Sequence, residues 1–478
     1  MKKILILALV AISLTSCNFL EVEKIGKSDI ETYFSEVNAL EPAVNGLYHL
    51  MYSFYDRYFI TYGEIAGDLV NLSASNTDWD RLFNYETECI TSDEVSAAGY
   101  IWKSGYEIIS NTNYLIYYAP KLKDSYPGYD ALIDNMTAQG YFVRGLITLN
   151  LCLVYAQTYT WSPDASHLGV PLLTRIPSMN DEVKRSTVKQ VYDQVIQDIE
   201  TAQRLFEGSS YQTKTPYFAG VDACKALLAR IYLYMHDYAK AKAYAEAVME
   251  KYPLTPHDKY VNMFCQATGY ASEEAILRLN GYDKSGSLQS FYKYDNAQGF
   301  PSGKLLEMFD SDDIREALQH YTVDVDGKTT HFSNINMKFY CTEQIADKDK
   351  HYDPFVLRSS EMYLIHAEAC CQEGALPEAE KDLKALIARA YGKTPAEITL
   401  TYSGKEGLDA LIMRERMKEL CFEGHRFFDI ARRHESVSRD SGSNARAKTL
   451  SYPDYRFALP IPRVEMDANP AMEQNEKY

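Results

Sequence analysis

The densest run of chemically capable side chains lies near the carboxyl end of the sequence, between Arg414 and Asp429. If this run is helical, Glu415 and Glu419 share one face, and Glu423 lies within reach beyond them. Two such carboxylates on either side of a glycosidic bond would be the catalytic pair of a glycosidase. The acids alternate with arginines and are followed by large apolar residues, and this pattern favours ion pairs that hold a helix against its neighbours.

Other catalytic or metal-binding patterns are missing from the sequence. It contains no nucleophile elbow, phosphate-binding loop or dinucleotide fingerprint, and its 10 histidines have no metal-ligand spacing. The segment from Asp324 to Gly327 is faintly similar to a calcium loop, but Ile335 stands where such a loop needs a carboxylate. We interpret it as a hairpin turn, and we expect no catalysis, no metal and no cofactor.

Tyrosine is unusually abundant, with 39 residues against 19 phenylalanines. Apolar faces of sugar rings stack on aromatic rings, while tyrosine hydroxyls and neighbouring polar groups bind sugar hydroxyls. Aromatic residues outside the helical patterns are therefore candidates for a glycan-binding surface, and they include Trp79, Tyr85, Tyr282, Tyr292 and Tyr294. We expect most of the other tyrosines to pack between helices with the hydroxyl reaching water.

The amino terminus has the pattern of a lipoprotein export signal. Two lysines precede an apolar run from Ile4 to Leu14, which is too short to span a bilayer, and small residues lead to Cys17. We expect residues 1–16 to be a signal peptide and Cys17 to carry lipid; an ordinary secretory signal that contains a cysteine is the alternative. Since no later stretch is apolar enough to span a bilayer, the lipid would be the only anchor.

Composition narrows the class of protein further. The balance of 49 Lys+Arg against 66 Asp+Glu, net charge -17, argues against nucleic acid, which requires a basic footprint. Most of the nine cysteines lie in apolar helical patterns without the spacing of a disulfide framework. We expect buried thiols at Cys152, Cys224, Cys370, Cys371 and Cys421.

Helical periodicity dominates the elements that would position these residues. Apolar residues recur at intervals of three and four, and two segments, 226–253 and 359–390, resemble tetratricopeptide hairpins with turns near His236 and Gly374. About three such pairs are needed to bury a continuous core, so helices around 136–155 and 188–205 are expected to complete the stack. The fold class is therefore mainly α.

Three segments between the helical blocks have a different composition. Residues 62–96, 155–184 and 252–353 are rich in Gly, Asn, Asp, Ser and Tyr. We expect loops and short hairpins there, carried on the helical scaffold, and loops on a rigid scaffold are where binding groups are usually placed.

Five motifs now stand out: Arg416-x-Lys418-Glu419-Leu420-x-Phe422-Glu423-Gly424-x-Arg426-x-x-Asp429, the run from Leu459-Pro460-Ile461-Pro462 to Tyr478, Trp102-x-x-x-Tyr106 leading to Asn113, Gly169-Val170-Pro171-Leu172, and Leu228 to Leu233. With these motifs the chain resembles, over nearly its whole mature length, the SusD/RagB family of outer-membrane nutrient-binding lipoproteins of Bacteroidetes. The resemblance implies tetratricopeptide-like helix pairs in a right-handed superhelical scaffold, plus an irregular loop-rich subdomain.

The resemblance also implies a domain organisation. Residues 17–478 would form a single SusD-like unit, with an amino-terminal region at about 17–220 and a carboxyl-terminal region at about 221–478. The loop-rich ligand subdomain would occupy about 252–353. The charged motif is structural in that family, which agrees with the ion-pair interpretation.

For function, the family resemblance implies that the protein captures oligosaccharides at the cell exterior and delivers them to a SusC-like TonB-dependent transporter. The chain would be anchored to the outer membrane by its lipid. Peptide binding, as in the RagB branch, is the nearest alternative; an all-α glycosidase and a purely structural lid are more distant ones. The ligand-binding positions that match are Trp79, Arg81 and Tyr85, in the loop after Gly63-Glu64-x-x-x-Asp68, and Tyr282, Tyr292 and Tyr294 in a second region.

Overall fold

The computed structural model describes residues 29–73, 79–87, 97–176, 178, 182–211, 213, 216–265, 272–281, 286–325, 328–339 and 352–478. The expected signal peptide, Cys17 and Tyr282 lie outside these ranges. Within them the chain is mainly helical, as predicted, and no helix is both long and apolar enough to cross a membrane.

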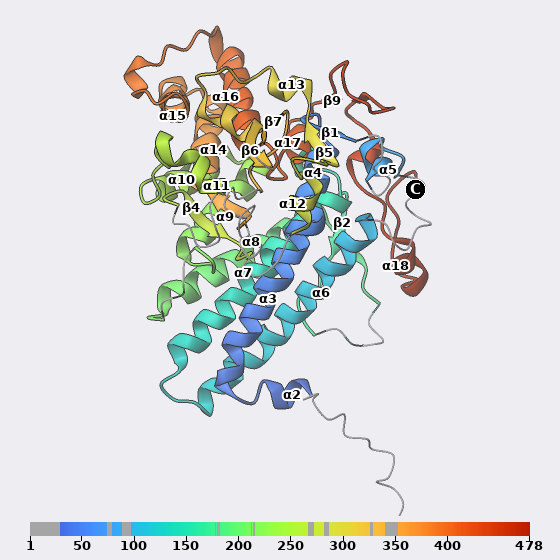
Figure 1. The fold of residues 1–478 in the computed structure, drawn as a ribbon. Coiled ribbons are helices and arrows are strands. Elements are labelled where there is room, and N and C mark those ends of the chain that lie inside the picture. Colours follow the sequence, from blue (N-terminus) through green and yellow to red (C-terminus); the bar gives the residue numbers. More distant parts are fainter. Residues whose placement is uncertain are drawn as a thin grey trace, which may run out of the picture.

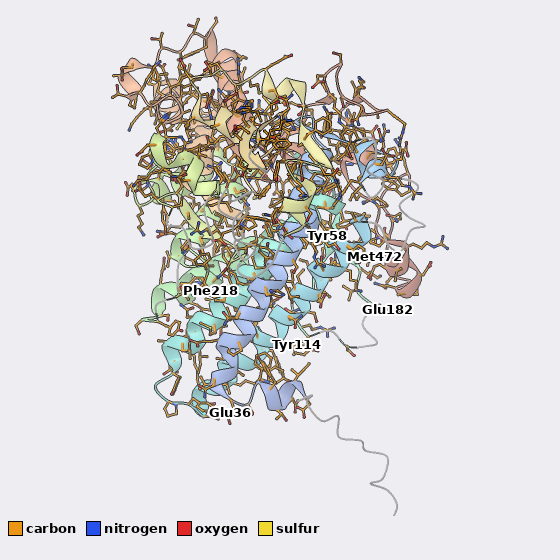
Figure 2. The ribbon with its side chains drawn as sticks, in the orientation of Figure 1. Glu36, Tyr58, Tyr114, Glu182, Phe218 and Met472 are labelled. Atoms are coloured by element: carbon orange, nitrogen blue, oxygen red, sulfur yellow. The ribbon has the colours of Figure 1, made fainter. Side chains whose placement is uncertain are left out.

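A bundle of long helices forms one part of the molecule (Figure 1). Helix α7 (Asp130–Tyr155) is its centre and is buried almost all round in its second half, because its residues from Phe142 onward are largely apolar. Around it pack α3 (Leu40–Phe54), α6 (Ala97–Tyr118) and α8 (Val188–Gly208). Figure 2 marks the length of this bundle by Tyr58, Tyr114 and Glu36, which lie in succession along it.

Two helix pairs lie beside this bundle and confirm the predicted tetratricopeptide-like hairpins. The first is α9 (Val221–Tyr234) with α10 (Tyr238–Met249), and the second is α14 (Ser359–Gln372) with α15 (Leu376–Ala390). Helix α10 packs on α14, so pairs far apart in sequence form one stack. Both turns fall where expected, and α16 (Gly404–Leu420) covers α14 and α15.

Short two-stranded sheets occur between the helices. The antiparallel pairs are β1 (Val70–Leu72) with β5 (Gly299–Pro301), β2 (Leu168–Pro171) with β3 (Arg185–Thr187), β4 (Ala275–Arg278) with β8 (Phe355–Arg358), β6 (His320–Val325) with β7 (Lys328–Ser333), and β9 (Val437–Ser438) with β10 (Thr449–Leu450). In the β6–β7 hairpin Val325 pairs with Lys328, and the predicted turn residues Asp326 and Gly327 lie outside the described ranges.

The remaining elements are short helical segments. They are α2 (Ile30–Tyr33), η1 (Val37–Ala39), η2 (Tyr55–Phe59), α4 (Ile60–Ile65), α5 (Asp80–Phe83), η4 (Ala119–Asp124), η5 (Tyr159–Trp161), η6 (His257–Lys259), α11 (Tyr260–Cys265), α12 (Ser287–Phe291), α13 (Gly303–Leu306), η7 (Ile314–Gln319), η9 (Pro395–Glu397), α17 (Arg426–Arg432), η10 (Tyr455–Phe457) and α18 (Arg463–Ala468). Segments expected to be loops and hairpins thus also contain single helical turns. The proposed boundaries of the amino-terminal, carboxyl-terminal and ligand-bearing regions stay predictions.

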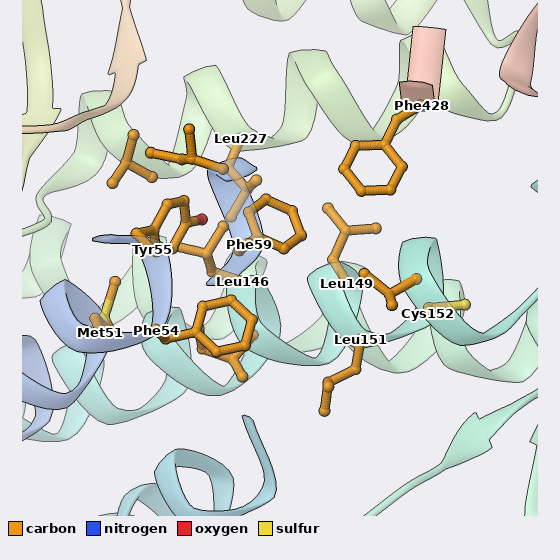
Figure 3. Packing of buried hydrophobic residues seen from close by; sticks show 14 of the residues in the cluster. Met51, Phe54, Tyr55, Phe59, Leu146, Leu149, Leu151, Cys152, Leu227 and Phe428 are labelled. Carbon is orange, nitrogen blue, oxygen red and sulfur yellow. The ribbon is translucent and has the colours of Figure 1, made fainter. Parts of the chain in front are cut away.

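The main core lies where α3, η2, α7, α9 and α17 meet (Figure 3). Phe59 stacks on Phe428 with ring centroids 5.4 Å apart, and Leu146, Leu149 and Leu227 fill the space beside them without exposure. Each such side chain stabilises the fold by about 1.5–3 kcal/mol. The predicted buried thiols are confirmed, because the cysteines at 152, 224, 370, 371 and 421 are all free and buried.

Motif residues from distant segments contact one another. The hydroxyl of Tyr106 donates to the carbonyl of Pro171, and the amide of Asn113 donates to the carbonyl of Leu173. The side-chain amide of Asn475 donates to the carbonyls of Tyr155 and Leu459. These bonds join the carboxyl-terminal run to the end of α7, so the motifs act as cross-links of the scaffold.

Candidate functional site

The carboxylates of the charged run are buried in ion pairs. Glu419 is fully buried at the end of α16, 2.7 Å from a guanidinium nitrogen of Arg358 and 2.8 Å from one of Arg389. Burial alone would raise the pKa of Glu419, but the surrounding guanidinium groups outweigh it and hold the pKa well below its usual range. This carboxylate stays ionised and paired.

Its neighbours are engaged in the same way. Glu423 pairs with Arg358 at 2.8 Å and with Lys338 at 2.6 Å, and these cations lower its pKa to about 2 against the opposing effect of burial. Glu415 pairs with Arg315 at 2.8 Å. A general acid needs a raised pKa and access to substrate. The prediction that these acids lock the helix in place is confirmed.

The charged motif also holds the segment that leads to the predicted ligand-binding loop. Gly63 lies so close to Gly424 that a Cβ there would collide with the carbonyl oxygen of Gly424. A carboxylate oxygen of Glu64 accepts from the backbone N–H of Gly424 at 2.7 Å. Asp68 pairs with Arg426 at 2.7 Å and with Lys304 at 2.6 Å. The start of β1 is therefore fixed to the carboxyl-terminal part of the chain.

Strand β1 brings the two predicted ligand-binding segments together, and β1 and β5 lie side by side above α4 in Figure 1. Beyond β1 the ring of Trp79 meets Phe291 edge to face at 6.5 Å, and Phe291 in turn meets Tyr292 at 4.8 Å. Gly299 of β5 passes directly over Phe291, where a Cβ would collide with the ring. Trp79 and Tyr292 thus share one aromatic cluster, joined by a phenylalanine that sequence reasoning missed.

Most of the predicted aromatic side chains lie beneath the surface. Trp79 is 8 % exposed, Tyr85 5 % and Tyr292 1 %, while Tyr294 is half-buried against Tyr321. Burial raises the pKa of Tyr292 well above its ordinary value, so its hydroxyl stays neutral. These rings form the buried base of the candidate ligand-binding surface. Their role in contacting ligand stays a prediction.

Polar groups surround this base. Arg81 is exposed, and Arg446 pairs with Asp80 at 2.7 Å and with Glu86 at 2.8 Å while its own side chain is 57 % exposed. Exposed ion pairs contribute only about 0–1 kcal/mol, so exchanging them for hydrogen bonds to a ligand costs little. We call segments 79–87 and 286–301 together with Arg446 the ligand face.

Arg439 holds the ligand face to the scaffold. Its guanidinium donates to the carbonyls of Ile65, Gly67, Phe83 and Ala447 and to the hydroxyl of Tyr85, which uses all five of its N–H groups. The local sequence gives no signal for this role, because four of the five acceptors come from residues 65–85, far from Arg439 in sequence. Arg446 was missed for the same reason.

The structure describes no group of three or more His, Cys, Asp or Glu side chains arranged to hold a metal ion. The ligand face combines aromatic rings at its base with exposed charged donors and acceptors at its rim.

Comparisons with known proteins agree with this architecture. A family model described as the SusD family matches residues 309–478, and one described as starch-binding associating with outer membrane matches residues 18–233. SusD-like protein P2 of Formosa agariphila is 24% identical over 98% of both chains. SusD-like protein P38 of the same organism is 22% identical and covers 100% of this chain and 99% of its own.

Solved structures superimpose over most of the chain. A SusD superfamily protein of Bacteroides thetaiotaomicron has a TM-score of 0.80 at 25% identity, covering 92% of this chain and 100% of that one. One from Bacteroides vulgatus has a TM-score of 0.77 at 26% identity, covering 92% and 99%. A SusD-like carbohydrate binding protein of Bacteroides vulgatus has a TM-score of 0.72 at 20% identity, covering 91% and 97%. With both family models matched and the fold shared, the chain belongs to the SusD/RagB family.

Proposed function

We propose that this protein is an outer-membrane lipoprotein that binds oligosaccharides at the cell exterior and passes them to a SusC-like TonB-dependent transporter. Support comes from the family model matched by residues 18–233, whose description joins starch binding to the outer membrane. One structural relative is described as a carbohydrate binding protein. The comparisons support the fold and the family, whereas the ligand class and the transporter partner are our inference.

The observation that carries the proposal is the composition of the ligand face. Rings of Trp79 and Phe291 lie at its base, and Arg81, Glu86 and Arg446 offer charged hydrogen-bonding groups at its rim. Sugars present an apolar ring face and hydroxyls around the edge, so one surface serves both parts. Weak affinity is sufficient, because a transporter held beside the protein gives a second contact at high effective concentration.

Binding without hydrolysis is consistent with the ion pairing of the carboxylates in the charged run. The carboxylates at 415, 419 and 423, any two of which could be read from the sequence as a catalytic pair, are buried and paired with arginine or lysine. A purified preparation that released reducing ends from a bound glycan would contradict this part of the proposal.

A lipid on Cys17 would explain how a chain of this kind stays at the membrane. About 12 residues separate Cys17 from Asp29, where the described structure begins. At about 3.3–3.6 Å per residue, a chain of this length spans at most roughly 40 Å.

Two variants test the ligand face. We expect Arg81→Ala and Tyr294→Ala each to weaken binding to a glycan found by array screening about tenfold, since the first removes an exposed hydrogen-bonding group from the rim and the second removes a half-buried ring from the base. Matched controls are Arg463→Ala, an exposed arginine on α18, and Tyr117→Ala, an exposed tyrosine on α6.

Unfolding measurements must show that all four variants keep the stability of the parent. Equal binding by the parent, Arg81→Ala and Tyr294→Ala would reject the ligand face. Silence on glycan arrays with retention of peptides would favour the peptide-binding branch instead.

A further inference from the structure

A second aromatic surface lies beyond the carboxyl end of α7. It is formed by Trp161 of η5, His434 after α17 and Tyr452 after β10, and we call these three residues the Trp161 surface. The rings of His434 and Tyr452 stack with centroids 4.6 Å apart, and Trp161 meets Tyr452 edge to face at 5.7 Å. His236 extends the row at 6.4 Å from His434. Four segments distant in sequence thus contribute to one line of rings.

Exposure distinguishes Trp161 from the other tryptophans. Trp161 is 36% exposed, whereas Trp79 and Trp102, the other two tryptophans, are 8% and 5% exposed. His434 is exposed as well, and Tyr452 is half-buried. About two thirds of the Trp161 side chain is buried and stabilises the fold, and the exposed remainder leaves part of a large apolar ring open to contact with a ligand.

The rings are held in place before any ligand arrives. The hydroxyl of Thr160 lies 2.8 Å from Nε2 of His434, and Nε2 of His236 lies 2.9 Å from the carbonyl oxygen of Arg432. Fixed side chains lose little conformational entropy on binding. Partial removal from water also lowers the pKa of both histidines, so they are uncharged at neutral pH and lose little hydration when a ring covers them.

A small cavity beneath the surface adds a hydrogen-bonding group. Its lining includes Gln157, Thr158 and Phe457, and the ring of Phe457 touches Tyr452 at 5.5 Å. The side-chain amide of Gln157 donates to two backbone carbonyls, but its Oε1 is buried and accepts no hydrogen bond from a described residue. The cavity volume is about 10 Å³, which admits one water molecule or one hydroxyl.

We propose that the Trp161 surface is a second carbohydrate-binding surface, on which a pyranose ring stacks against Trp161 while a hydroxyl, directly or through a water, reaches Gln157. It shares no residue with the ligand face. The inference rests on the proposed function, because it takes the ligand to be a glycan. A neutral set of rings with an unfilled acceptor fits a sugar better than a charged peptide or a lipid headgroup.

Two surfaces on one molecule change how a polymer is bound. When one segment of a polysaccharide occupies the ligand face, a second segment meets the Trp161 surface at high local concentration. Removing the Trp161 surface should therefore weaken binding of a polysaccharide more than binding of its short oligosaccharides.

The test is native electrophoresis of the purified protein in gels cast with amylopectin, xyloglucan or α-mannan, in which retardation at several concentrations gives Kd. In the gel that retards the parent, we expect Trp161→Ala and His434→Ala each to raise Kd about five- to tenfold. Tyr117→Ala is the matched control, because Tyr117 is 52% exposed but lies at the opposite end of the α6–α7 pair. Thermal melts must show that the variants are folded. If Trp161→Ala does not fold, His434→Ala alone tests the Trp161 surface.

Each outcome separates the two proposals. Retardation of the parent with unchanged Kd in both variants overturns the Trp161 surface and leaves the ligand face standing. If the variants keep the Kd of the parent but no longer co-purify with an outer-membrane barrel, the carbohydrate-binding role of the Trp161 surface is also overturned. These rings would then belong to a protein contact. A parent that no gel retards overturns the proposed function, and the Trp161 surface with it.

Discussion

Replacing Glu64 with glutamine tests whether a buried carboxyl group beneath the ligand face is protonated in the folded protein. Glu64 is fully buried; one oxygen accepts from the N–H of Gly424 at 2.7 Å, and the other has no hydrogen-bond partner among the described residues. Burial raises its pKa from 4.5 to about 7, because a charge there would lack water and a close counter-charge. Glutamine has the shape of the protonated acid and keeps the acceptor for Gly424.

The magnitude follows from the shift of the pKa. Each pKa unit corresponds to 1.36 kcal/mol, so a rise from 4.5 to about 7 corresponds to about 3 kcal/mol. Because the folded-state pKa is the higher one, the stabilisation is fully present below pH 4.5 and is lost as the pH rises through 7. The difference in unfolding free energy, Glu64→Gln minus parent, should therefore grow by about 3 kcal/mol between pH 4 and pH 8.

Urea unfolding of both proteins at pH 4, 5, 6, 7 and 8 measures this difference, since groups common to both cancel. Asp68→Asn is the control of opposite sign, because Arg426 and Lys304 outweigh burial and lower the pKa of Asp68. Loss of the Asp68 charge in Asp68→Asn should lower the free energy of unfolding more at pH 7 than at pH 4. A Glu64→Gln difference that stays flat with pH, or that favours the parent at pH 8, would refute the reasoning.

Three further changes probe the frame around the ligand face. Glu419→Ala leaves buried guanidinium groups without their common partner and should lower the unfolding free energy by about 3–5 kcal/mol in urea titrations, whereas a loss below 1 kcal/mol would show that the network is dispensable. Gly63→Ala forces a methyl group onto the backbone of Gly424 and should lower the melting temperature sharply, while Gly46→Ala, with nothing near its Cβ, should not. Cys17→Ser should move the protein from the detergent phase to the aqueous phase in phase partitioning of cell extracts, and an unchanged partition would reject lipid at Cys17.

Helices could be predicted where the pattern is local. The pair α9–α10 follows from a short apolar period and from Ala241 and Ala245, which are fully buried and let the second helix approach the first. The charged run was interpreted correctly for a similar reason: acids, arginines and apolar residues within one short segment indicate a buried, ion-paired helix. Both signals need no knowledge of a distant partner.

The ligand face could be predicted only in part, because distant residues decide it. The family resemblance selects the two segments, but burial of Trp79 depends on Phe291, more than 200 residues away, and burial of Tyr292 depends on Phe339 and Phe422. No periodicity within one segment reports such contacts. The pairing of β1 with β5 is equally remote, so the sequence does not show which aromatic side chains remain at the surface.

This division between base and rim bears on specificity. Glu64, Asp68 and Arg439 hold the backbone of residues 65–68 to the carboxyl-terminal part of the chain, and changes there alter stability before they alter recognition. The rim residues Arg81 and Arg446 are exposed, and exposed ion pairs contribute about 0–1 kcal/mol. Substitutions at the rim can therefore change which hydroxyls are bound while the fold keeps its stability. Selectivity among glycans should reside in the charged rim, and the buried tyrosines should set only the shape beneath it.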